Sequence, residues 1–187
     1  MNIYIIHGWG GSPESDWIPW LKRELEDQGY NVIVPAMPDT DAPEINVWVG
    51  YLKEIVKNPD SNTFFVGHSN GCQAVMRYLD SSEVKIGGAL FIAGWFNLKN
   101  LEDEEVPIAE PWITTSMDFD EIKGSIGNLR VILSDNDPYD CLQENKEKFE
   151  KLGGQVIIVP GAGHFAGDDG TTELPLARNI LFEMMAI

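Results

Sequence analysis

A serine stands between two glycines in the run Gly-His-Ser-Asn-Gly at residues 67–71. An apolar run at residues 62–66 precedes it, and a segment of helical period follows. A strand, a Gly-x-Ser-x-Gly turn and a helix together push the serine hydroxyl out above the edge of a sheet. The helix then directs its first N–H groups and the positive end of its dipole to the same place. The pattern predicts that Ser69 is a nucleophile, the alternative being a glycine-rich turn with an incidental serine.

A nucleophilic serine needs a base, and the chain contains three histidines. His7 ends the first apolar run. His68 lies inside the turn, where its side chain cannot reach the neighbouring hydroxyl. His164 follows the last apolar run on a glycine-rich loop, from which a side chain can reach across the C-terminal edge of a sheet. We therefore predict that His164 is the general base.

A carboxylate must orient that histidine and stabilise the imidazolium that forms. In one common order of elements it lies between the serine and the histidine in the chain. The run Ser-Asp-Asn-Asp-Pro at residues 134–138 follows an expected strand and offers Asp135 and Asp137. We predict Asp137, because it lies well past the strand end and Pro138 stiffens the exit. Asp135 is expected to cap the turn.

Two backbone N–H groups must hold the negative charge that develops on the substrate oxygen. Asn70, directly after the nucleophile, is expected to supply one. The loop His-Gly-Trp-Gly-Gly at residues 7–11 is expected to supply the other. We favour Trp9 as that donor, with its indole as a pocket wall; the alternative is a plain turn.

The remaining pocket candidates lie beside strand ends, where ligands bind in parallel sheets. Trp95 and Phe96 follow an expected strand, and His68 adjoins the nucleophile. Simple core packing is an equally good interpretation of the two aromatic residues. No phosphate-binding glycine motif is present, and the histidines and cysteines lack metal-ligand spacing. The sequence therefore predicts neither a cofactor nor a metal.

Short apolar runs alternate with segments of helical period along the chain, which indicates a parallel sheet covered on both faces. We expect an α/β fold, a three-layer α/β/α sandwich around a mostly parallel six-stranded sheet, without a large lid. The expected strands are Ile3–His7, Asn31–Val34, Asn62–Val66, Gly88–Ala93, Leu129–Ser134 and Gln155–Val159. The expected helices are Trp17–Asp27, Val47–Val56, Asn70–Leu79, Cys141–Leu152 and Pro175–Met185.

The length of 187 residues is typical of one domain, and we expect a single domain over residues 1–187. Residues 95–128 are irregular and form either a reduced cap over a pocket or a surface loop with a short helix. The net charge of −17 disfavours nucleic acids and anionic membranes as partners. The first apolar run is too short for a signal peptide, so we expect a cytoplasmic protein. A monomer is the default expectation.

The chain resembles the small serine hydrolases related to retinoblastoma-binding protein nine, a compact branch of the α/β-hydrolases. The resemblance spans nearly the whole chain in order. It rests on residues 7–11, the tryptophans and leucine at 17, 20 and 21, the Pro-Ala-Met-Pro run at 35–38, residues 67–71 and 76–79, and the loops at 134–138 and 161–165. It implies a cofactor-free triad of Ser69, Asp137 and His164 in a shortened fold. It also favours Asp137 over Asp135, because the acid of the family directly precedes the proline.

These observations together predict a serine hydrolase that acts on small esters through an acyl-enzyme, most simply a carboxylesterase. Amides and thioesters are substrates of the same chemistry, and the sequence does not separate them. The alternative is a protein-interaction or ligand-binding module on the same scaffold with vestigial activity.

Overall fold

The six expected strands form one sheet in the computed structural model, which describes residues 1–186. Within these residues the strand order is β2-β1-β3-β4-β5-β6, and every neighbouring pair is parallel. The strands are β1 (Asn2–Ile6), β2 (Asn31–Ile33), β3 (Thr63–His68), β4 (Gly88–Ile92), β5 (Leu129–Ser134) and β6 (Gln155–Val159). The prediction of a six-stranded parallel sheet is confirmed.

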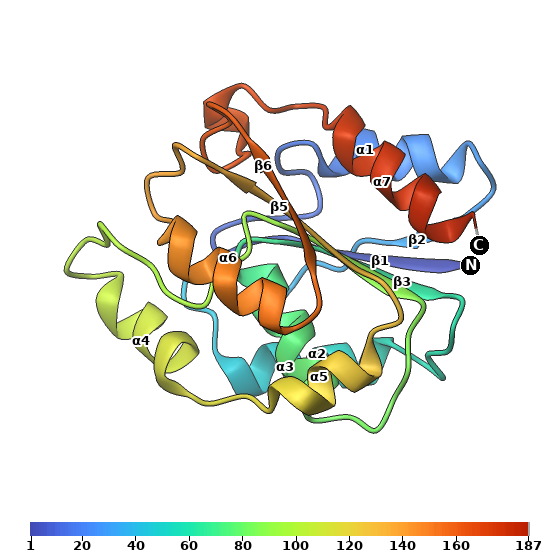
Figure 1. Ribbon diagram of the computed structural model, residues 1–187, viewed down its shortest axis with the longest axis horizontal. Coiled ribbons are helices and arrows are strands. Elements are labelled where there is room, and N and C mark those ends of the chain that lie inside the picture. The colour runs from blue at the N-terminus through green and yellow to red at the C-terminus, as the bar shows by residue number, and fades with distance from the viewer. Residues whose placement is uncertain (187) are drawn as a thin grey trace.

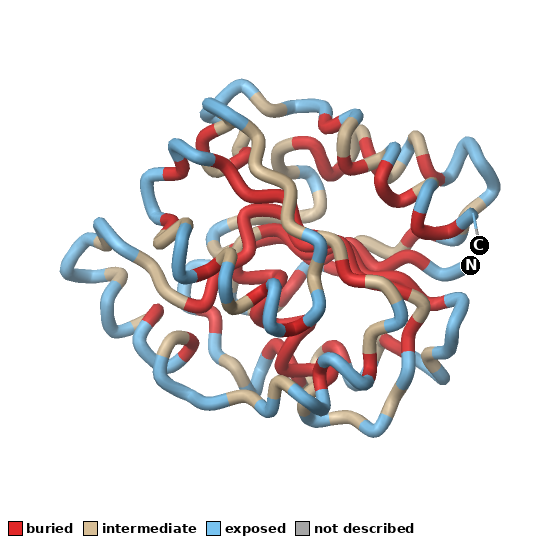
Figure 2. Tube along the Cα trace, in the orientation of Figure 1, coloured by how far each residue is buried: buried red, intermediate tan, exposed pale blue. Residues whose placement is uncertain are grey.

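The central strands are apolar on both faces because each face carries its own hydrophobic core. Side chains alternate across a strand, so neighbours in the sequence enter different cores. In β3, Phe65 belongs to one core cluster, whereas Phe64 and Val66 belong to the other. Figure 2 shows the resulting band of buried backbone through the middle of the molecule. Such strands appear in a sequence as continuous apolar runs rather than alternating ones.

Helices cover both faces of the sheet, which confirms the three-layer arrangement (Figure 1). The core on one face includes side chains of α1 and α7, and the core on the other includes side chains of α2, α3, α5 and α6. The bounds of these helices are α1 (Ile18–Glu26), α2 (Ile45–Ile55), α3 (Asn70–Asp80), α5 (Phe119–Ser125), α6 (Leu142–Lys151) and α7 (Pro175–Met185).

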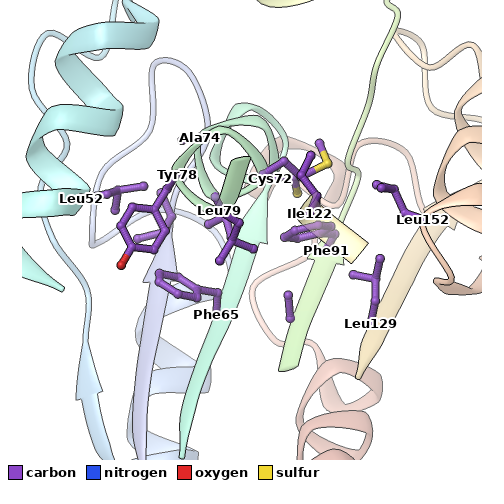
Figure 3. Close-up of a cluster of buried hydrophobic side chains, with 14 of the residues drawn as sticks. Leu52, Phe65, Cys72, Ala74, Tyr78, Leu79, Phe91, Ile122, Leu129 and Leu152 are labelled. Atoms are coloured by element: carbon purple, nitrogen blue, oxygen red, sulfur yellow. The ribbon is translucent and has the colours of Figure 1, made fainter. Parts of the chain in front are cut away.

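Helix α3, which directly follows β3, packs closely on the sheet. Figure 3 shows Tyr78 and Leu79 of this helix beside Phe65 of β3, with Phe91 of β4 nearby. All four residues are at most 3% exposed. This packing fixes where α3 begins, and therefore fixes the turn between β3 and α3.

The irregular segment 95–128 contains α4 (Val106–Thr114) and α5. The buried Arg77 of α3 holds the end of α4 by donating hydrogen bonds from Nη2 to the carbonyl oxygens of Trp112 (2.7 Å) and Thr115 (3.0 Å). The Trp112 indole N–H donates to the carbonyl of Pro43 at 2.8 Å. The segment is thus tied to the body of the molecule, and the stretch before α4 borders the cavity described below. Nowhere in residues 1–186 is a helix long and apolar enough to cross a membrane.

Candidate active site

Loops from the C-terminal ends of several parallel strands meet around one cavity of about 300 Å³. Parallel strands bring all their C-terminal ends to the same edge, so residues distant in sequence become neighbours. The cavity lining includes Trp9 after β1, Ser69 and Asn70 after β3, Trp95 after β4, Tyr139 after β5 and His164 after β6.

The turn that presents Ser69 has a strained backbone. Ser69 has φ 50° and ψ −119°, a conformation that L-residues rarely adopt. Its N–H donates to the carbonyl of Ile92 at 2.9 Å, and α3 begins at the next residue. A Cβ atom on Gly71 would overlap the carbonyl oxygen of Ile6 in β1. The turn therefore requires glycine at position 71, because the obstacle is backbone in a central strand.

We expect Gly71→Ala to lower the free energy of unfolding by about 3 kcal/mol, because backbone must shift to admit the methyl group. Gly50→Ala is the matched control. Gly50 lies inside α2 and has no atom within 4 Å of the position of an added Cβ, so alanine should stabilise the protein by up to about 1 kcal/mol. Urea unfolding of both variants checks this pair, and equal effects of the two substitutions would contradict the steric account of the turn.

Asp137 and His164 form the central hydrogen bond of the site. His164 Nδ1 lies 2.7 Å from Asp137 Oδ2, and the Asp137 side chain is 2% exposed. The other carboxylate oxygen accepts the backbone N–H of Tyr139 at 3.0 Å, which orients the group. With Nδ1 as the donor to the carboxylate, the lone pair of the ring lies on Nε2. Within residues 1–186 this is the one hydrogen bond of the ring; serine–histidine bonds often tighten only in the complex with substrate.

The neighbours of Asp137 hold the histidine loop instead of the histidine ring. Asp135 Oδ1 accepts the N–H of Gly161, and Asn136 Oδ1 accepts the N–H of Gly163, both at 2.8 Å. On the far side of the loop, Asp169 Oδ2 accepts the backbone N–H of His164 at 2.7 Å. These bonds fix a glycine-rich loop that would otherwise be mobile, and they give Asp135 a role separate from that of Asp137.

The two expected N–H donors lie at the cavity beside Ser69. A Cβ on Gly8 would come within 3.1 Å of Ser69 Cβ, so the loop after β1 passes directly over the serine. Among the described residues no acceptor engages the N–H of Trp9 or of Asn70. The Asn70 N–H belongs to the first turn of α3, where backbone donors lack helical partners. Both groups are thus available to a substrate oxygen.

His68 braces the histidine loop from inside the protein. Its Nε2 lies 2.9 Å from the carbonyl oxygen of His164, which makes Nε2–H the donor. The ring is buried and contacts Trp17 edge-on. Burial, reinforced by the charge of His164, lowers the pKa of His68 to about 4. His68 is therefore neutral near pH 7 and places no positive charge beside His164.

This depressed pKa predicts acid sensitivity. An unfolded chain protonates a histidine near pH 6.5, whereas folded His68 stays neutral until about pH 4. The unfolded state takes up the proton first, so the free energy of unfolding should fall as the pH drops from about 6.5 to about 4, by about 3 kcal/mol in total. Burial lowers the pKa of His7 as well, which adds in the same direction.

Urea unfolding between about pH 7 and about pH 5 measures this loss in the native protein and in His68→Gln. Glutamine can donate the same hydrogen bond but cannot be protonated. The variant should lose less stability over this interval, by up to about 2 kcal/mol. Equal losses in both proteins would show that His68 is not the group responsible.

The structure places some predicted pocket residues elsewhere and adds others. His68 and Phe96 do not line the cavity: His68 lies behind the histidine loop, and Phe96 packs against Phe149 with ring centroids 4.7 Å apart. Trp9 and Trp95 line the cavity. The lining residues that the sequence analysis did not single out are Gly10, Leu98, Leu101, Glu105 and Tyr139. Tyr139 could have been found from the sequence, because it lies two residues after the expected acid, Asp137.

Comparison with known proteins assigns the chain to a family. The model of the serine hydrolase family matches residues 3–183, so the chain belongs to that family. The resemblance stated from the sequence is confirmed.

Particular relatives cover almost the whole chain. YdeN of Bacillus subtilis is 29% identical over 182 residues, which span 96% of this chain and 94% of YdeN. Its crystal structure has a TM-score of 0.91 and covers 100% of this chain and 99% of that one. Serine hydrolase RBBP9 of Rattus norvegicus is 25% identical over 180 residues, which span 95% of this chain and 94% of RBBP9. A structure from work on carboxylesterases of Nitrososphaera gargenis has a TM-score of 0.71 at 15% identity and covers 99% of this chain and 89% of that one. At this identity the likeness shows the fold alone.

Proposed function

We propose that this serine hydrolase cleaves small carboxylic esters, with Ser69 as nucleophile, His164 as general base and acid, and Asp137 as the orienting carboxylate. The observation that carries the proposal is the 2.7 Å contact between His164 Nδ1 and the buried Asp137, at a cavity that Ser69 also lines. This combination supplies an activated nucleophile, which a pure binding site does not need.

The proposed reaction has two balanced halves. Ser69 Oγ attacks the ester carbonyl carbon while its proton passes to His164 Nε2. The N–H groups of Trp9 and Asn70 hold the oxyanion, and the tetrahedral intermediate expels the alcohol, which takes that proton. Water then attacks the acyl-enzyme and gives one proton to His164. The carboxylic acid leaves, and the Ser69 oxygen takes up that proton from His164. Asp137 stabilises the imidazolium in both halves.

The size and lining of the cavity favour small substrates. A volume of about 300 Å³ lies at the lower end of ligand pockets. Trp9, Trp95, Leu98 and Leu101 provide apolar surface beside the serine. Carboxylesterases share the fold, which adds support for esters over the amides and thioesters that the same triad can attack.

Labelling by a fluorophosphonate probe tests the proposal, because such probes react with activated serines. We expect stoichiometric labelling of the folded protein, followed by hydrolysis of p-nitrophenyl esters that declines as the acyl chain outgrows the cavity. Folded protein that resists the probe would overturn the proposal and favour a binding module on the same scaffold.

A further inference from the structure

The cavity beside Ser69 carries an acidic group and several aromatic rings, a combination that ester hydrolysis itself does not require. Glu105, at the start of α4, lines it together with Trp9, Trp95 and Tyr139. Across the described residues, no lysine or arginine lines this cavity. Lys99, which is close to Tyr139, is exposed and lies outside the lining.

The surrounding structure holds the indoles of Trp9 and Trp95 in place. The Trp9 indole N–H donates to the carbonyl of Asp41 at 3.0 Å. Trp95 is 2% exposed, and its carbonyl accepts a hydrogen bond from Gln73 Nε2 at 2.6 Å. Tyr139 is 37% exposed, and its ring contacts His164 edge-on with centroids 5.5 Å apart. Rings fixed in advance lose little entropy when a ligand contacts them.

Glu105 is fixed as well, because one of its carboxylate oxygens accepts the backbone N–H of Glu102 at 2.8 Å. The side chain is only partly exposed, so a charge near it is less screened than one on the open surface. The whole chain carries a net charge of −17, which adds a field that attracts cations and repels anions.

From this arrangement we infer that the site selects substrates that carry a compact ammonium group, such as a quaternary ammonium ester. Aromatic faces attract cations that lie within about 6 Å, and quaternary ammonium groups are a common ligand of such aromatic sites. The small volume of the cavity keeps a bound group near the rings, and Glu105 supplies the opposite charge. The inference rests on the proposed function for its reaction but concerns selectivity, which the triad does not determine.

Two pairs of probes with matching shape isolate the charge. Acetylcholine and 3,3-dimethylbutyl acetate differ in a quaternary nitrogen that replaces a carbon, and choline and 3,3-dimethylbutan-1-ol differ in the same way. We expect kcat/KM to favour acetylcholine over its neutral analogue by roughly tenfold. Choline should likewise inhibit hydrolysis of a neutral ester more strongly than the alcohol does.

Glu105→Gln keeps the acceptor for the Glu102 N–H and removes the charge. We expect it to reduce the preference for acetylcholine to about threefold or less. Glu104→Gln is the matched control, because it removes the same charge from the next residue, which is exposed and outside the lining. It should retain the full preference. No preference in the native protein, or one that survives Glu105→Gln unchanged, would overturn the inference.

A calorimetric titration with choline and with the alcohol reads the same selectivity without catalysis. If the probe labels Ser69 but the cationic and neutral partners behave alike, the selectivity inference fails and the proposed hydrolase stands. If labelling fails while choline binds more tightly than the alcohol and Glu105→Gln removes that difference, the proposed reaction fails and the cation site stands.

Discussion

Replacing Ser69 by alanine should lower kcat for a p-nitrophenyl ester by about 10⁶-fold and abolish fluorophosphonate labelling. In the proposed reaction, Ser69 Oγ is the atom that forms the acyl-enzyme, and neither His164 nor the N–H donors can replace it. The substitution removes a single oxygen from a turn whose backbone is held by the Ser69 N–H bond to Ile92. Steady-state kinetics and labelling of the purified variant check this result.

Two controls accompany Ser69→Ala: its unfolding curve and its combination with His164→Ala. Its unfolding curve should match that of the native protein, because alanine can occupy the same position without a new contact. His164→Ala should lower kcat nearly as much as Ser69→Ala does. The double variant should have a kcat no lower than that of either single variant, because the two residues are proposed to act in one step. Additive losses in the double variant would show that the two side chains do not share a step.

Asp137→Asn is the second large effect, and we expect it to lower kcat by about 10⁴-fold while the fold persists. The asparagine oxygen can still accept the Tyr139 N–H, and its amide group would then face His164 Nδ1. That amide is a donor, so Nδ1 must become the acceptor and the ring proton moves to Nε2. A protonated Nε2 cannot accept the proton of Ser69.

Asp135→Asn is the matched control for the choice of the acid. Asp135 contacts the backbone N–H of Gly161 instead of the imidazole, and asparagine can accept the same bond. We expect a loss of less than about tenfold. A larger loss for Asp135→Asn than for Asp137→Asn would reverse the assignment of the two aspartates.

The sheet could be predicted because its central strands are buried on both faces and most of the strands are separated by helices of clear period. The helices α4 and α5 were not predicted as such, for physical reasons. Helix α4 contains Pro111 and depends on Arg77 and Pro43 to hold it in place. Helix α5 has only 7 residues. Contacts from distant parts of the chain stabilise both helices, and such contacts leave no periodic pattern within the segment.

In the candidate site, too, local motifs could be found from the sequence, whereas residues brought in by the path of the chain could not. The spacing of chain-local motifs led to Ser69, Asp137 and His164, and the structure places Asp137 and His164 in direct contact. Their catalytic roles stay predictions until the variants are measured. Glu105 was not singled out, because its place at the cavity depends on how the chain returns from β4 to α4. His68 was predicted to line the pocket but does not, because its sequence proximity to Ser69 does not reveal the direction of its side chain.

The position of β6 has a consequence for how the protein loses function on heating. This strand lies at the edge of the sheet, and Val156–Val159 are only partly buried, unlike the strands at the centre. Edge segments with little buried surface open at a lower free-energy cost than the core does. Because β6 is followed by the loop with His164, local opening there separates His164 from Ser69 while β1, β3 and β4 remain folded. Amide hydrogen exchange in β6 is therefore expected to track thermal inactivation more closely than exchange in the central strands does.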